Sequence, residues 1–256
     1  MLFNKLYFFL SITLLGVNFF GISLPPKTTA STGNIPGYNF PIYSKDTLIN
    51  LMNGEPIKHI DTSFIFNLNE VVFKTIPHGS PAELKFQNNW VLYILSFIKG
   101  DSFLFTQNSK YIILGDAAVC SQKARLVNEI AKKNRIKARF ITFTGHVVSE
   151  VKINQDWYIL DPDFGIVLPF GFSDLKYSKN HSTIRTKLLM RGFKKSAIED
   201  YVAIVSNNKI KIHNEYEAHE PKLWMIERVT TFLSWVIPTI ALLSSAYKLF
   251  YFKLKI

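Results

Sequence analysis

Three side chains of the sequence carry the chemistry of a nucleophilic catalytic site. Cys120 is the single cysteine among 256 residues, and His146 and Asp161 follow it along the chain. A thiolate attacks carbonyl carbon, an imidazole beside it accepts the thiol proton, and a carboxylate behind the imidazole fixes the tautomer of the ring. We therefore predict that Cys120 is a nucleophile, that His146 is its base and that Asp161 orients the base.

A helix is predicted to begin close to the cysteine. Asp116 is a natural N-cap for the stretch AAVCSQKARLVNEIAKKN, residues 117–134. The helical repeat places one row of small and apolar side chains toward the interior: Cys120, Ala124, Val127 and Ala131. It places three polar residues toward water: Lys123, Asn128 and Lys132. The thiol then lies near the helix N-terminus, where unpaired backbone N–H groups favour a thiolate.

Strand-like stretches follow this helix, at residues 136–144, 147–153 and 157–161. Residues 154–155 are predicted to form a two-residue turn that pairs Ile153 with Asp156. Asp161 then shares a face of the sheet with His146, one diagonal step away. A three-residue loop would put the carboxylate on the opposite face, so the triad depends on an even-length turn.

Several roles stay open at the level of sequence. Asp163 is an alternative orienting residue, because the same pairing puts it opposite His146. The backbone N–H of Cys120 is one candidate donor to an oxyanion, and Gln107 or Asn108 is a candidate for the second. A lone cysteine is also commonly a small buried hydrophobe, and a lone histidine a satisfied core residue, which gives the non-catalytic interpretation of both side chains.

The residues around the triad resemble the core of the transglutaminase-like superfamily, a branch of the papain-like cysteine enzymes. The resemblance covers residues 115–170 and is carried by Ala138-Arg139, Gly145-His146, Glu150-Val151, Trp157-Tyr158 and Asp161-Pro162. It implies an α+β fold, in which a helical lobe with the cysteine at a helix N-terminus packs on an antiparallel sheet that carries His146 and Asp161. It also implies that Cys120 is the nucleophile, His146 the base and Asp161 its orienter.

The chain departs from the family pattern at two places. Gln122-Lys123 stand where the family often has an aromatic residue, and Val147-Val148 stand where it often has Ala-Trp. The resemblance implies that these positions line the substrate cleft. Trp157 is expected to pack under the site. The remaining histidines have no metal-ligand spacing, and we expect them at the surface: His59, His78, His181, His213 and His219.

Two uncharged apolar runs lie near the ends of the chain. Residues 6–24 and 229–247 each comprise 19 residues without a charged side chain. A helix of that length is about 28 Å long, close to the hydrocarbon thickness of a bilayer. We predict two transmembrane helices, the alternative for each run being a buried core helix. The first run is either a signal peptide, with a cleavage site at residues 28–30, or a retained anchor.

Lysines flank both runs and indicate the orientation of the chain in the membrane. They are Lys5, Lys248, Lys253 and Lys255. Positive charge beside a membrane span favours the cytoplasmic side, which places the middle of the chain on the outer side of the inner or plasma membrane, periplasmic or extracellular.

The expected organisation follows from these runs: a signal peptide or anchor (1–26), a linker (27–45), one transglutaminase-like domain (46–222), a transmembrane helix (229–247) and a basic cytoplasmic tail (248–256). Within the domain, residues 80–83 (Ser-Pro-Ala-Glu) are predicted to start a helix that carries Trp90 and ends at Gly100.

These features predict a membrane-tethered cysteine peptidase or amidase, or a transglutaminase-type acyltransferase, that needs no cofactor or metal. The expected partners are a peptide or amide substrate, the membrane, and envelope or polysaccharide-assembly components. Without the four flanking lysines, the middle of the chain has 26 of the 30 basic side chains and all 19 acidic ones. Its net charge of +7 favours anionic lipid or acidic polymer, and without a stacking motif we expect no nucleic-acid partner. The alternative is a non-catalytic module that binds at the cell envelope.

Overall fold

The computed structural model describes residues 2–23, 44–57, 60–175, 177–206, 209–214 and 219–253. These residues form two compact units. One contains the described parts of residues 1–27, 83–107 and 222–256, and the other contains those of residues 28–82 and 108–221. Residues 46–222 are expected from the sequence to form one domain, whereas residues 83–107 group with the terminal helices. All three residues of the predicted triad lie in the second unit.

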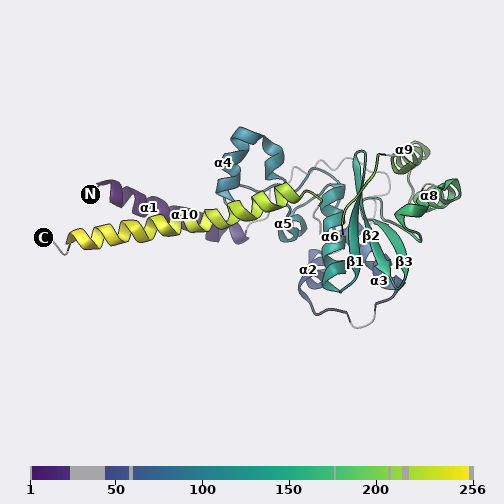
Figure 1. The fold of residues 1–256 in the computed structure, drawn as a ribbon, viewed down its shortest axis with the longest axis horizontal. Coiled ribbons are helices and arrows are strands. Elements are labelled where there is room, and N and C mark those ends of the chain that lie inside the picture. The colour runs from purple at the N-terminus through teal and green to yellow at the C-terminus, as the bar shows by residue number, and fades with distance from the viewer. Residues whose placement is uncertain are drawn as a thin grey trace. The chain divides into compact units, whose positions relative to one another are not determined.

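The second unit is an α+β fold built on a five-stranded antiparallel sheet, as the fold class predicted (Figure 1). In spatial order its strands are β4 (Ile166–Leu168), β3 (Asp156–Asp161), β2 (His146–Ile153), β1 (Lys137–Phe143) and β5 (Lys211–Ile212). The helices of this unit are α2 (Lys45–Asn53), α3 (Thr62–Thr75), α5 (Ser109–Leu114), α6 (Cys120–Lys133), α7 (Phe172–Leu175), α8 (Ser178–Met190) and α9 (Lys195–Ser206).

The turn between β2 and β3 has the predicted length. Ile153 pairs with Asp156, so Asn154 and Gln155 form a two-residue loop. Asn154 has a φ of 55°, in the left-handed region that asparagine tolerates better than most residues. The register that the triad requires is therefore fixed by a local feature of the chain.

Side-chain alternation along β2 and β3 divides the core of this unit in two. Val151 and Leu160 pack in a cluster with residues of α2, α3 and α6. Val148 and Ile159 point to the opposite face and pack with residues of α8 and α9. Helices therefore cover both faces of the sheet. Each aliphatic side chain that they bury fully contributes about 1.5–3 kcal/mol of transfer free energy.

The first unit contains α1 (Leu2–Ser23), α4 (Trp90–Lys99), a 3-10 helix (Asp101–Leu104) and most of α10 (Pro221–Lys253). Both α1 and α10 are long and apolar enough to cross a membrane. The Nδ2 group of Asn18 in α1 donates to the Ser234 carbonyl in α10 at 2.6 Å. Such a hydrogen bond between apolar helices satisfies polar groups that lipid cannot.

The start of α4 differs from the prediction. Residues 80–83 are not helical, and the helix begins at Trp90 because the side chain of Asn89 caps it by accepting from Leu92 N at 3.0 Å. The predicted helix start at residues 80–83 instead contacts α6. The side-chain amide of Gln122 bonds both the N–H and the carbonyl of Ala82, at 2.9 and 3.0 Å. The predicted end is confirmed, because Gly100 follows the last helical residue with a φ of 95°.

Candidate active site

Cys120 is the first residue of α6. Val119 precedes it with extended dihedrals, and the Val119 carbonyl accepts the backbone N–H groups of the third and fourth helical residues. The thiol therefore lies at the positive end of the helix dipole, as predicted. The cap differs from the prediction, because Asp116 lies outside the helix and its carboxylate is 3.6 Å from Lys45 Nζ.

The inward row of α6 is confirmed. Ala124, Val127 and Ala131 are fully buried. Cys120 is half-buried and packs against a small apolar cluster of Ala124, Phe140 and Val147. The sulfur thus lies at the edge of the packed interior, where it is supported by hydrocarbon and remains partly accessible.

His146 is the first residue of β2 and lies between the other two members of the predicted triad. Its Nε2 lies 2.7 Å from Asp161 Oδ2, and the Cys120 side chain is close enough to the ring to contribute to the pKa of His146. Because the two ring nitrogens point in opposite directions, Nδ1 is the nitrogen that remains for the thiol. Burial by itself lowers the pKa of His146, but the charge and hydrogen bond of Asp161, aided by Cys120, raise it well above 6.5.

Asp161 ends β3 and is fully buried with four hydrogen-bond donors around it. Oδ2 lies 2.7 Å from His146 Nε2 and accepts the Tyr201 hydroxyl at 2.8 Å. Oδ1 accepts the backbone N–H groups of Asp163 and Phe164, at 2.9 and 3.1 Å. Such donors offset the cost of removing a buried carboxylate from water. The prediction that Asp161 and His146 share a face is confirmed by this contact.

Aromatic rings surround the imidazole. Phe164 meets the His146 ring edge-on, with 5.4 Å between ring centroids, and Tyr201 does so at 5.8 Å. Phe164 and Tyr201 pack on each other at 4.7 Å. These rings exclude water from the His146–Asp161 contact, which strengthens the attraction between the two groups. Sequence reasoning missed Tyr201, because no local pattern connects a tyrosine of α9 to an aspartate 40 residues earlier.

Asp163, the alternative orienter, bonds other groups. Its carboxylate lies 2.7 Å from His78 Nδ1 and 3.3 Å from Lys123 Nζ. Lys123 and Asn128 were predicted to face water, but both are buried. The reason is tertiary, since Lys123 reaches its acidic partner on the β3–β4 turn. The structure therefore brings together Cys120, His146 and Asp161, with Asp163 in a second polar network beside them.

Two further residues of the family-like motif, one on β1 and one on β2, form an ion pair. Arg139 and Glu150 face each other on β1 and β2, with Nε 2.6 Å from the carboxylate. The guanidinium lies over the Trp157 ring, 4.3 Å from its centroid, so Trp157 is a packing residue. It lies near the start of β3, whereas Asp161 ends the strand, so it does not pack under the site as expected. Glu150 also accepts the N–H of Phe172 at 2.6 Å. This set ties three strands to the first residue of α7.

The positions expected to line a cleft are mostly used in packing. Gln122, Lys123, Val147 and Val148 are all at least nine-tenths buried. Gln107 and Asn108, the candidates for the second oxyanion donor, also have other contacts. The Asn108 side chain caps α5 by accepting from Lys110 N, and the Gln107 backbone N–H donates to Glu227 within the first unit.

The expectation of surface histidines is wrong for His213 and His219, whereas the His78 side chain is 37% exposed. His78 contacts Asp163, while His213 and His219 lie at the Thr142 hydroxyl, 3.0 and 3.2 Å from it. His213 is 2% exposed. His181 Nε2 lies 3.0 Å from the Leu175 carbonyl, and His59 lies outside the described residues. Among the residues that the structure describes, no group of three or more His, Cys, Asp or Glu side chains is arranged to hold a metal ion.

His146, Asp161 and Tyr201 thus form a hydrogen-bonded set that reaches α9, and the Cys120 side chain lies beside the His146 ring. Comparisons of the chain with protein-family models, curated proteins and solved structures found no match. The chemistry of the site therefore follows from its geometry. This arrangement can move a proton from sulfur to the imidazole and stabilise the resulting cation against the carboxylate.

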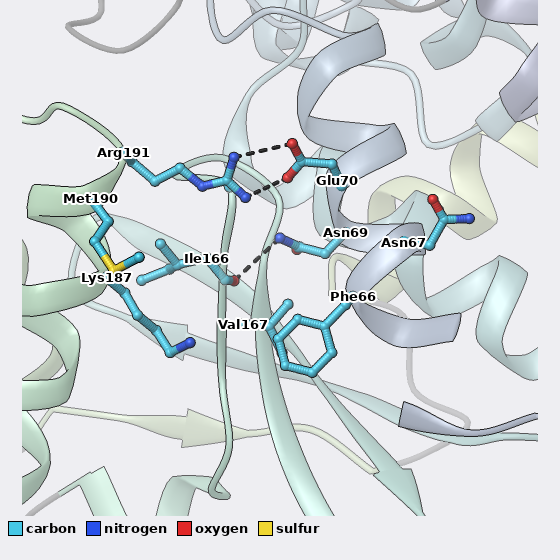
Figure 2. Close-up of a pocket in the computed structure, with 10 residues that line it drawn as sticks. Phe66, Asn67, Asn69, Glu70, Ile166, Val167, Lys187, Met190 and Arg191 are labelled. Carbon is cyan, nitrogen blue, oxygen red and sulfur yellow. Dashed lines mark hydrogen bonds and ion pairs between the residues drawn. The ribbon is translucent and has the colours of Figure 1, made fainter. Parts of the chain in front are cut away.

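A cavity of about 580 Å³ lies elsewhere in the second unit (Figure 2). Phe66, Glu70, Val167, Lys187 and Arg191 are among its lining residues. Arg191 pairs with Glu70 through two guanidinium nitrogens, a contact that Figure 2 shows. None of the three triad residues lines this cavity, so it is separate from the predicted chemistry.

Proposed function

We propose that the protein is a membrane-tethered cysteine enzyme that forms an acyl-enzyme from a peptide or other amide. One observation carries the proposal: His146 lies between Cys120, at a helix N-terminus, and the buried Asp161 carboxylate, which is 2.7 Å from its Nε2. The resemblance of residues 115–170 to transglutaminase-like enzymes and the α+β fold support it. The papain-like assignment of the core is part of the proposal.

The first half-reaction uses the three groups in order. The Cys120 thiol proton passes to His146 Nδ1, and the sulfur attacks the amide carbon to form a C–S bond. The carbonyl oxygen becomes an oxyanion, toward which the Cys120 backbone N–H can donate, since the first N–H groups of a helix lack carbonyl partners within it. The imidazolium then protonates the leaving nitrogen, the C–N bond breaks, and an amine and a thioester remain.

The second half-reaction regenerates the thiol. Neutral His146 accepts a proton from water or from an amine, and the oxygen or nitrogen attacks the thioester carbon. The C–S bond breaks, and the proton returns from the imidazolium to the sulfur. Water gives hydrolysis, and an amine gives acyl transfer. The triad serves both outcomes equally, and exclusion of water from the acyl-enzyme favours transfer.

The location of the enzyme is part of the same proposal. The apolar helices α1 and α10 tether the chain to the membrane. Lysines beside their outer ends, including Lys5 and Lys248, favour the cytoplasmic side for both termini. The catalytic unit then lies on the outer face, where peptide and amide components of the cell envelope are its substrates.

A non-catalytic envelope module is the second candidate function. The observation that favours it is the burial of Gln122, Lys123, Val147 and Val148, which leaves these positions unable to shape a cleft as the resemblance implies. A thiol held beside a buried His–Asp pair argues for catalysis instead, because a binding module has no need of it.

Thiol reactivity distinguishes the two functions. The full chain in detergent would be labelled with iodoacetamide at pH 6, and since Cys120 is the single cysteine, every adduct reports on it. If His146 activates the sulfur, His146→Ala slows labelling about tenfold or more. His181→Ala is the matched control, because His181 lies in α8 and bonds the Leu175 carbonyl. Equal rates in all three proteins would support the binding module.

Acyl-enzyme trapping tests the reaction itself. Wild type and Cys120→Ala would be incubated with envelope extracts, quenched in acid and examined by mass spectrometry. A mass increase on the peptide that contains Cys120, absent from the variant, identifies the acyl group. An adduct present in both proteins would contradict the proposed nucleophile.

A further inference from the structure

We propose that Asp163 and Lys123 are positioning residues, whose buried ion pair holds the helix with Cys120 against the turn with Asp161. This inference rests on the proposed function and assigns a role to two residues outside the triad. Lys123 lies one turn after Cys120 in α6, and Asp163 lies two residues after Asp161. The pair therefore joins the elements that carry the nucleophile and the orienting carboxylate.

The Lys123–Asp163 pair is buried between α6 and the turn that follows β3. Lys123 Nζ lies 3.3 Å from Asp163 Oδ1, and their side chains are 0% and 5% exposed. Lysine is rarely fully buried without a partner, because desolvating an ammonium group is costly. Lys123 Nζ also lies 5.7 Å from the centre of the Phe73 ring. A small displacement of α6 would separate the charges, so the pair opposes such a displacement.

A third contact ties the chain on the other side of the cysteine. His78 Nδ1 lies 2.7 Å from Asp163 Oδ2. The segment with His78 is paired with Ala118, since Gly79 N donates to the Ala118 carbonyl and Ala118 N donates to the Pro77 carbonyl, at 3.3 and 3.0 Å. One carboxylate therefore restrains residues two before and three after Cys120.

Asp163 is also coupled to the triad. Its backbone N–H donates to Asp161 Oδ1 at 2.9 Å, so the turn that places the Asp163 carboxylate also fixes the orienting one. Burial by itself raises the pKa of Asp163, but the charges of Lys123, His78 and His146 lower it to about 2. The group is a carboxylate across the neutral range, and its negative charge favours the imidazolium form of His146.

The test compares the pH–rate profile of Cys120 alkylation in the full chain in detergent, between pH 5 and 9. Asp163→Asn is expected to slow alkylation at pH 6 about fivefold or more and to move the profile to higher pH. The matched control is Glu70→Gln, an acid-to-amide change at a carboxylate that also accepts from two cations, Arg191 (Figure 2) and Lys74. It should lower the melting temperature while leaving the alkylation profile within twofold of wild type.

A second variant distinguishes a loss of positioning from a loss of folding. Asp163→Asn removes the carboxylate opposite the buried Lys123 ammonium, whereas the double variant Lys123→Met/Asp163→Asn removes both charges and is better tolerated. If the double variant keeps a cooperative thermal transition and its profile is still displaced, positioning is supported. A profile that overlays wild type in either folded variant overturns the inference.

The same experiment separates this inference from the proposed function. His146→Ala is included in each series. If His146→Ala slows alkylation and the Asp163 variants do not, the triad stands and the positioning role fails. If His146→Ala has no effect, the proposed function itself fails.

Discussion

Tyr201 donates its hydroxyl to the same oxygen of Asp161 that faces His146, at 2.8 Å. Burial and the Asp161 charge raise the pKa of Tyr201 well above 10, so the hydroxyl remains a donor at neutral pH. A residue of α9 therefore completes the set of donors around the orienting carboxylate. Helix α9 has a role in the site as well as in the core.

Tyr201→Phe should lower the free energy of unfolding by about 2 kcal/mol, because a hydrogen bond to a buried carboxylate is lost and the ring packing is kept. Thermal unfolding of the detergent-solubilised chain, followed by tryptophan fluorescence, measures the loss. Cys120 alkylation should stay faster than in His146→Ala, since the His146–Asp161 contact survives. Alkylation as slow as in His146→Ala would show that the hydroxyl does more than hold the carboxylate.

Asp161→Asn should abolish most activity with a smaller effect on folding. Oδ1 accepts two backbone N–H groups that cannot be reversed, so the new amide NH₂ must face His146. The imidazole then takes the tautomer with its proton on Nδ1 and cannot accept one from Cys120. Such a change costs roughly 10⁴-fold in a serine triad.

Asp156→Asn is the control for this change, because Asp156 is exposed at the other end of the same strand. The measurement is the rate of acyl-enzyme formation, or of alkylation at pH 6. Equal rates in the two variants would remove Asp161 from the mechanism.

His219 should make the protein less stable in mild acid. Burial, followed by the charges of His213, Arg125 and Lys211, lowers its pKa to about 4. Below the unfolded-state value of about 6.5 the unfolded chain binds a proton that the folded chain does not, so stability falls as pH drops from 6.5 toward 4. The full effect is up to about 3 kcal/mol.

The comparison for His219 is between wild type and His219→Gln, with melting temperatures measured from pH 7.5 to 4.5. As pH falls, the melting temperature of wild type should drop more than that of His219→Gln. Glu220 lies 3.7 Å from His219 Nε2 but is half-exposed, so solvent weakens its effect. Parallel curves would mean that the ring is charged in the folded protein as well.

Two glycines next to the site should respond differently to alanine. Gly165 has a φ of 68°, and a Cβ there would lie 2.8–2.9 Å from three carbons of the Phe73 ring. Gly145, before His146, has a φ of 82° but open space around a Cβ. Gly145→Ala should therefore cost about 1–2 kcal/mol from backbone strain alone. Gly165→Ala should cost about 1–3 kcal/mol more from overpacking, measured by thermal unfolding. Equal losses would show that Phe73 can move aside.

Much of the site could be predicted from the sequence because its parts are locally encoded. Helical periodicity gave the buried row of Ala124, Val127 and Ala131 beside Cys120. The two-residue turn at Asn154 fixed the strand register, and the register put His146 and Asp161 on one face. Each inference uses residues within a few positions of one another, where backbone geometry leaves few choices.

Other features depended on segments that meet only in the folded chain. Lys123 is polar and three residues from Cys120, so its position on the helix indicated solvent. It is buried because Asp163 and the segment with His78 pack over that part of α6. Residues 83–107 likewise group with the terminal helices, although nothing in their composition separates them from the domain around them.

The sequence by itself determined the residue types at the site, the elements that carry them and the register between the strands. The tertiary structure decided which further groups complete it: Tyr201 on Asp161, and Lys123 and His78 on Asp163. The physical reason is that periodicity states which side of an element is apolar, while the burial of a charged group depends on whether an opposite charge from a distant segment reaches it.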